Sequence, residues 1–170
     1  MPSSGFHANG YSLIRHIVTS RNLSLDKEIP ELQKSLGEVL LTPTEIYTRD
    51  CLVLMKALAG SLRAFSHITG GGLAANTERV IPQGLCATFD RSTWRLPCEF
   101  EYLSKAGSVP QPDMERTWNC GVGMVAVIDK ATVELALKTL SARGMKAWIA
   151  GEVIQTDSDS RSMLQGNYIS

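Results

Sequence analysis

The sequence lacks the features that mark several large classes of protein. Its 17 Lys and Arg residues balance 17 Asp and Glu residues, so no basic excess would attract nucleic acid or an anionic membrane. Its four cysteines include no Cys-x-x-Cys pair, which excludes a disulfide scaffold and a zinc ribbon. No signal-peptide pattern opens the chain. The longest apolar run, residues 124–128, is far shorter than the ~20 residues that span a bilayer. We therefore expect a cytoplasmic protein that has neither nucleic acid nor a membrane as its partner.

The apolar residues are numerous enough for one folded domain, which we place at residues 1–170. They make up 44% of the chain, close to the average for globular proteins. We expect Asn9 and Asp129 to cap the helices that follow them, and Cys86 and Cys98 to lie in the core. Periodicity predicts helices near residues 10–18, 36–40, 51–60, 72–81, 98–106, 113–118 and 130–143, and strands at 62–69, 85–89, 123–128, 146–154 and 163–166. This order predicts an α+β fold of three layers (α/β/α), with helices on both faces of a mixed β-sheet.

Three consecutive glycines, Gly70, Gly71 and Gly72, follow His67 and Thr69 between a predicted strand and a predicted helix. Glycine has no Cβ, so a ligand can approach the backbone closely there. The N–H groups of such a turn, at the positive end of a helix, can hold an anion such as phosphate. The alternative is a tight turn without a ligand, for which one glycine would be enough.

The same segment also fits a second pattern. Gly70-x-Gly72-x-x-Ala75, with Asp90 at the end of the next strand, has the spacing of a dinucleotide-binding βαβ unit. Against this reading, the helix has only about eight residues before Pro82, which is short for such a crossover. No second mononucleotide-binding half follows it.

Two further segments place polar side chains beside glycines. The first is the opening turn, whose candidates for binding a substrate or phosphate are Ser3, Ser4, Gly5, Asn9 and Gly10, and whose alternative is a frayed terminus. The second contains Asn119, Gly121 and Gly123 at the entrance to a buried strand, where a β-bulge is equally compatible.

Two of the three histidines border these glycine turns. His7 and His67 are the candidate catalytic residues, because imidazole can donate a hydrogen bond to phosphate or exchange a proton near neutral pH. The acids nearest to the turns, Glu78 and Asp90, form no pair suited to a metal ion, so we expect no metal site in this chain.

Taken together, four segments resemble the C-terminal half of the aminoimidazole ribonucleotide synthetase (phosphoribosylformylglycinamidine cyclo-ligase) family. The resemblance extends over essentially the whole chain, with Ala8 and Trp118 as departures from the usual serine and phenylalanine. The four segments are Ser3-Ser4-Gly5-Phe6-His7-Ala8-Asn9-Gly10, Thr42-Pro43-Thr44-Glu45-Ile46-Tyr47, His67-Ile68-Thr69-Gly70-Gly71-Gly72 and Thr117-Trp118-Asn119-Cys120-Gly121-Val122-Gly123.

The resemblance implies an ATP-dependent ring closure in purine biosynthesis. In that reaction the formamide oxygen of formylglycinamidine ribonucleotide is phosphorylated, and a nitrogen of the same molecule then displaces phosphate. ATP and Mg²⁺ would be bound mainly by an N-terminal half that nothing in this chain matches. The isolated chain would then be inactive, and its partners would be a nucleotide substrate and either a separate N-terminal half or further copies of itself. The alternative is a non-catalytic remnant that binds phosphate or nucleotide.

Overall fold

The computed structural model describes residues 1–169, so Ser170, the last residue of the predicted domain, lies outside the described part. The helices are α1 (Tyr11–Ser20), α2 (Leu36–Leu40), α3 (Thr48–Leu58), α4 (Gly72–Glu78), α5 (Cys98–Gly107), α6 (Gln111–Thr117) and α7 (Val133–Ser141). The strands are β1 (Glu28–Ile29), β2 (Lys34–Ser35), β3 (Leu62–His67), β4 (Leu85–Asp90), β5 (Met124–Ile128), β6 (Gly151–Gln155) and β7 (Ser162–Gln165). Within residues 1–169, no helix is long and apolar enough to cross a bilayer.

The fold mixes helices and strands, as predicted, but its strands do not form one sheet. Strand β3 pairs antiparallel with β5, while β4 lies between antiparallel β6 and parallel β7. A short hairpin of β1 and β2 is the third sheet found in the described residues. The predicted mixed sheet is therefore present only as the three-stranded unit β6–β4–β7, and the edges of β5 and β6 do not pair with each other.

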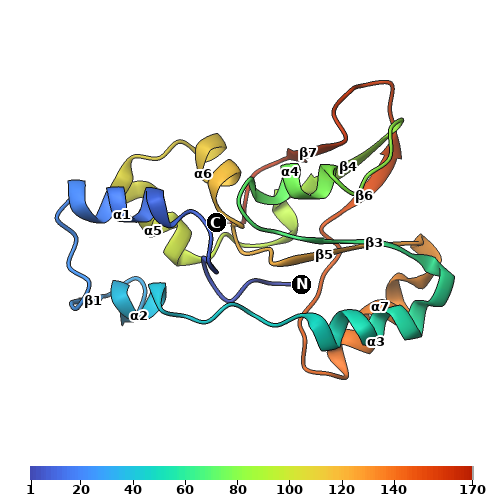
Figure 1. Cartoon of the computed structure of the whole chain (residues 1–170), viewed down its shortest axis with the longest axis horizontal. Coiled ribbons are helices and arrows are strands. Elements are labelled where there is room, and N and C mark those ends of the chain that lie inside the picture. The colour runs from blue at the N-terminus through green and yellow to red at the C-terminus, as the bar shows by residue number, and fades with distance from the viewer. Residues whose placement is uncertain (170) are drawn as a thin grey trace.

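Helices lie on both sides of β3 and β5. Figure 1 shows α4 on one side of these strands and α3 and α7 on the other. Leu54 and Leu58 of α3 and Leu140 of α7 form one core with the strands, because their apolar side chains recur at helical spacing. A second core lies under α4, around Ile68, Leu73 and Phe89.

A third core holds the glycine-rich turns in place from the side of α1 and α5. Phe6 packs against Phe100 with ring centroids 4.4 Å apart, and against Trp118 at 5.1 Å. All three rings are buried. Burial of an aromatic side chain is worth about 1.5–3 kcal/mol, so this cluster fixes the positions of the opening turn and of the segment that precedes β5.

Several local predictions were wrong, and for the two predicted caps the reason is that the side chain found a distant partner. Asn9 does not cap α1: its Oδ1 accepts a hydrogen bond from the Gly70 N–H at 3.1 Å. Asp129 makes no side-chain cap, because both of its carboxylate oxygens accept hydrogen bonds from Arg63, at 2.8 and 2.7 Å. Cys86 is buried as predicted, whereas Cys98 is exposed at the first position of α5.

The predicted strand at residues 146–154 is shorter than expected. Strand β6 begins only at Gly151, although Ala150 already accepts a hydrogen bond from the Asp90 N–H at 2.9 Å. A strand forms where a neighbouring strand supplies hydrogen bonds, and among the described residues none pairs with residues 146–149.

Candidate functional site

The opening turn and the triple-glycine loop meet at one hydrogen bond. The Gly70 N–H donates to Asn9 Oδ1 at 3.1 Å, across 61 positions of the sequence. This contact brings together two of the segments that the sequence analysis selected. It also means that the Gly70 N–H, expected to be free for an anion, already has a partner in this structure.

The third predicted segment joins the opening turn through Asn119, which is fully buried. Asn119 Nδ2 donates to the Gly5 carbonyl at 2.8 Å, and Asn119 Oδ1 accepts from the Ser3 hydroxyl at 2.8 Å. The same oxygen accepts from the Gly121 N–H at 2.9 Å. Asn119 therefore fixes the turn from inside, which is the role that a buried, satisfied amide usually has.

The three glycines of the loop occupy different environments. Gly70 is exposed, and a Cβ at this position would meet no atom within 4 Å. Gly71 has φ +102° and stands at the N-cap of α4. Gly72 is buried with φ +71°, and a Cβ there would overlap the Glu115 carbonyl. Close packing explains Gly72, whereas no neighbouring atom explains Gly70.

A buried residue that the sequence analysis missed holds this loop. Asn76 of α4 is only 4% exposed, and its Nδ2 lies 3.2, 3.2 and 2.8 Å from the carbonyl oxygens of Thr69, Gly70 and Gly72. Its Oδ1 accepts from the Thr69 hydroxyl at 3.1 Å. The signal available in the sequence was an amide side chain four positions after the last glycine, one helical turn away.

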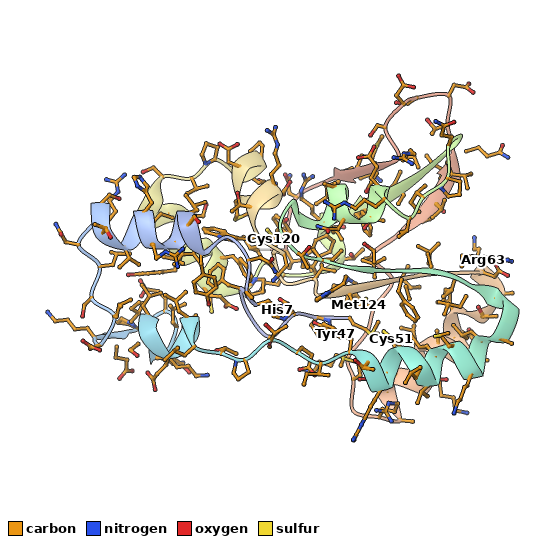
Figure 2. The ribbon with its side chains drawn as sticks, in the orientation of Figure 1. His7, Tyr47, Cys51, Arg63, Cys120 and Met124 are labelled. Atoms are coloured by element: carbon orange, nitrogen blue, oxygen red, sulfur yellow. The ribbon has the colours of Figure 1, made fainter. Side chains whose placement is uncertain are left out.

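Three rings gather beside the glycine turns. Their centroids are 6.4 Å apart for His7 and His67, 6.2 Å for His7 and Tyr47, and 5.9 Å for Tyr47 and His67. Figure 2 shows His7 and Tyr47 near the centre of the molecule. The Tyr47 hydroxyl donates to the Pro2 carbonyl at 2.6 Å. A Cβ at Gly123 would overlap that hydroxyl, so the strand entrance needs glycine to accept Tyr47.

The two histidines differ in exposure. His67 is exposed, whereas His7 is 4% exposed. Burial is the larger cause, and the positive charge of His67 the smaller one, that holds the pKa of His7 below its usual 6.5. His7 Nε2 accepts the Ser4 N–H at 3.1 Å, so the proton of the neutral ring is on Nδ1. That Nδ1 atom is buried and has no partner among the described residues.

The arrangement offers donors for an anion but no ligands for a divalent cation. Within residues 1–169 there is no group of three His, Cys, Asp or Glu side chains close enough to hold a metal ion. Mg²⁺ prefers carboxylate oxygens together with phosphate oxygens, so the residues that the structure describes do not by themselves fit a magnesium site.

The dinucleotide-binding alternative is wrong. A βαβ unit requires two parallel strands in one sheet, whereas β3 and β4 belong to different sheets. Helix α4 between them has only seven residues. The Asp90 carboxylate accepts the Ser92 N–H at 2.9 Å and caps the turn that follows β4.

Residues 1–163 match the sequence profile of the family described as "AIR synthase related protein, C-terminal domain". The chain belongs to this family. It is 52% identical over 154 residues to a Streptomyces fradiae protein named "Putative phosphoribosylformylglycinamidine cyclo-ligase", a match that covers 90% of this chain and 84% of that protein. The resemblance found in the sequence motifs is therefore confirmed.

Other relatives from this family are much longer. The chain is 41% identical over 153 residues to the Sorangium cellulosum phosphoribosylformylglycinamidine cyclo-ligase, covering 89% of this chain but 44% of that protein. It is also 41% identical over 154 residues to the human trifunctional purine biosynthetic protein adenosine-3, covering 15% of it. The AIR synthase related domain thus spans less than half the length of these two relatives.

Proposed function

We propose that this AIR synthase related domain is the substrate-binding portion of a phosphoribosylformylglycinamidine cyclo-ligase. The observation that carries the proposal is the hydrogen bond from Gly70 to Asn9. It holds an exposed glycine without a packing role beside a turn that bears a histidine. The Gly70 N–H itself is engaged by Asn9, but a nucleotide group can approach the loop closely there because no Cβ stands in the way. The names of the relatives supply the reaction.

In this proposal the exposed groups contact the substrate, and the buried ones position them. Gly70, Gly71 and the exposed His67 face the ribose phosphate. His7 uses its unpartnered Nδ1–H either as a donor or to transfer a proton. Phosphoryl-transfer enzymes act mainly by positioning and charge stabilisation, which suits such a set of fixed donors. Thr69, Asn119, Gly121 and Gly123 keep the surrounding turns in place, and Ser3, Ser4, Gly5 and Gly10 shape the opening turn.

ATP and Mg²⁺ would be held mainly by a second polypeptide half. The described residues contain no cluster of three or more His, Cys, Asp or Glu side chains that could hold the metal ion. The longer relatives contain more than twice the length that this chain matches. We therefore propose that the chain alone turns over no substrate. Mixed with the N-terminal half of the Sorangium cellulosum enzyme, it would form aminoimidazole ribonucleotide.

Two measurements test the proposal. The first is a steady-state assay of ATP-dependent product formation by the chain alone, by the Sorangium cellulosum half alone and by the mixture. The second is calorimetric titration of the chain with formylglycinamidine ribonucleotide and, separately, with ATP. Substrate binding that is weakened in His67→Ala and unchanged in His16→Ala, an exposed histidine on α1, supports the assignment. Turnover by the chain alone, or equal binding by both variants, contradicts it.

The second candidate is a non-catalytic domain that binds nucleotide or phosphate. It is favoured by one fact, that the chain spans less than half of several catalytic relatives. Substrate binding without turnover in any mixture would select this function over the first.

A further inference from the structure

A buried ion pair supports the helix that packs against the triple-glycine loop. Arg91, which follows β4, donates two parallel hydrogen bonds to Glu115 of α6, from Nε to Oε1 at 2.7 Å and from Nη2 to Oε2 at 2.8 Å. The two side chains are only 14% and 12% exposed. A second bidentate pair, Arg63 with Asp129, is 60% and 39% exposed. Bidentate bonding fixes both the position and the orientation of a carboxylate, and burial keeps water from competing for Glu115.

Two further side chains converge on the same carboxylate. Gln111 Nε2 donates to Glu115 Oε1 at 2.8 Å, and the Tyr168 hydroxyl donates to the same oxygen at 3.0 Å. Burial opposes the charged form of Glu115, but the hydrogen bonds from Arg91, Gln111 and Tyr168 outweigh it and hold the pKa of Glu115 below its usual value. Glu115 is therefore an ionised carboxylate with four bonds that fix it.

The segment that follows β7 is tied to the ion pair as well. Arg91 Nη1 donates to the Gly166 carbonyl at 3.1 Å, and the guanidinium carbon lies 5.9 Å from the centre of the Tyr168 ring. That ring packs edge-on against Trp94, with centroids 5.5 Å apart. Three segments far apart in the sequence thus meet at Glu115, namely the turn after β4, helix α6 and the segment after β7.

The backbone of Glu115 carries this restraint to the loop. Helices α4 and α6 pack against each other, as Figure 1 shows. Gly72 begins α4, and a Cβ there would overlap the Glu115 carbonyl. The Gly72 carbonyl also accepts a hydrogen bond from Asn76 Nδ2 at 2.8 Å. Because close-packed atoms transmit a displacement to their neighbours, a shift of Glu115 would move Gly72, and with it Gly70 and Gly71.

We propose that Arg91, Glu115 and Tyr168 are positioning residues for the triple-glycine loop. They contact no substrate, and they act by fixing Gly72, so that the two glycines before it are presented in the geometry that binds a nucleotide. A loop held in its bound geometry loses less conformational entropy when the ligand binds, so it binds more tightly. The inference rests on the proposed function for what the loop binds, whereas the control of the loop by the ion pair does not depend on it.

Hydrogen exchange of the Gly72 amide, followed by NMR on the full chain, measures the loop without any ligand. The Gly72 N–H donates to the Thr69 carbonyl at 3.0 Å, so its exchange rate reports opening of the loop. The reference amide is that of Asp129, which donates to the Ser61 carbonyl at 2.9 Å at the opposite end of β3 and β5. Tyr168→Phe keeps the ring and removes only the hydroxyl. We expect at least about threefold faster exchange at Gly72 in this variant and no change at Asp129.

Substitutions of the arginine extend the test. Lysine keeps the positive charge but cannot form the bidentate pair, so Gly72 should exchange faster in Arg91→Lys than in the unchanged chain. In Arg91→Ala it should exchange at least about tenfold faster, because the partner carboxylate stays buried without a cation. The matched control is Arg63→Ala, which breaks the exposed bidentate pair and should leave Gly72 exchange unchanged. If Arg91→Ala does not fold, Arg91→Lys and Tyr168→Phe still decide the question.

Calorimetric titration with formylglycinamidine ribonucleotide measures the consequence for binding. The Kd should rise at least about threefold in Tyr168→Phe and in Arg91→Lys, because a loosened loop must be ordered again on binding. In Arg63→Ala the Kd should stay the same. A loss of general stability would not produce this pattern, because it would speed the exchange of Gly72 and Asp129 alike.

Three results would overturn the proposal. They are unchanged Gly72 exchange in both Tyr168→Phe and Arg91→Lys, equal acceleration at Gly72 and Asp129, and faster Gly72 exchange with an unchanged Kd. If the unchanged chain does not bind the nucleotide at all, the proposed function fails, while the exchange rates still decide whether the ion pair controls the loop. The two failures can therefore be told apart.

Discussion

The unequal roles of the three loop glycines lead to a sharp prediction for alanine substitutions. Gly72 has φ +71°, and an added Cβ would overlap the backbone carbonyl of Glu115. A left-handed conformation costs a non-glycine residue about 1–2 kcal/mol, and overpacking against backbone costs about 1–3 kcal/mol more. Gly72→Ala should therefore lower the free energy of unfolding by roughly 2–5 kcal/mol, a large part of the roughly 5–15 kcal/mol that stabilises most domains.

The matched control is Gly70→Ala, only two positions away. Gly70 has no positive φ, and a Cβ there would meet nothing within 4 Å, so its free energy of unfolding should change by no more than about 0.5 kcal/mol. Urea denaturation followed by tryptophan fluorescence measures both variants. Equal destabilisation by the two substitutions would refute the argument. A Gly70→Ala protein that is stable but binds formylglycinamidine ribonucleotide less tightly would show that this position serves the ligand.

Two further predictions concern charged and titratable groups. Arg91→Ala should lower the free energy of unfolding by about 3–5 kcal/mol. The Glu115 carboxylate, which is 12% exposed and bonded to Arg91 at 2.7 Å, would be left without its cation. The control is the exposed ion pair of Lys105, for which Lys105→Ala should cost less than about 1 kcal/mol in the same urea titration. The pKa of His7 is lower in the folded protein than in the unfolded chain. The unfolded chain therefore binds the proton at a higher pH, and stability is lost as the pH falls below about 6.5 and through the lower pKa of folded His7. His7→Gln should flatten this acid limb, and an unchanged pH profile of the urea midpoint would contradict the assignment.

The element order could be predicted from local patterns, because periodicity and turn residues act over a few positions. The short helix at 36–40 begins at a capping box of Ser35 and Glu38. The strands at 62–67 and 85–90 form where apolar residues recur, each run including a phenylalanine. Helix α3 keeps Leu54 and Leu58 in the core, whereas Met55, next to Leu54 in the chain, is 52% exposed.

The sequence by itself was enough to predict the family, the order of the elements and the positions of the glycine turns, because each of these depends on residues that are contiguous in the chain. Only the tertiary structure decided which groups each turn meets. Asn9 was free to cap its own helix but bonds Gly70 instead, Asp129 bonds Arg63, and Asn76 holds the glycine loop. Only the tertiary structure shows that a cavity divides the predicted sheet. Hydrogen-bond partners far apart in the chain, and gaps between strands, depend on how whole layers pack, which no local pattern encodes.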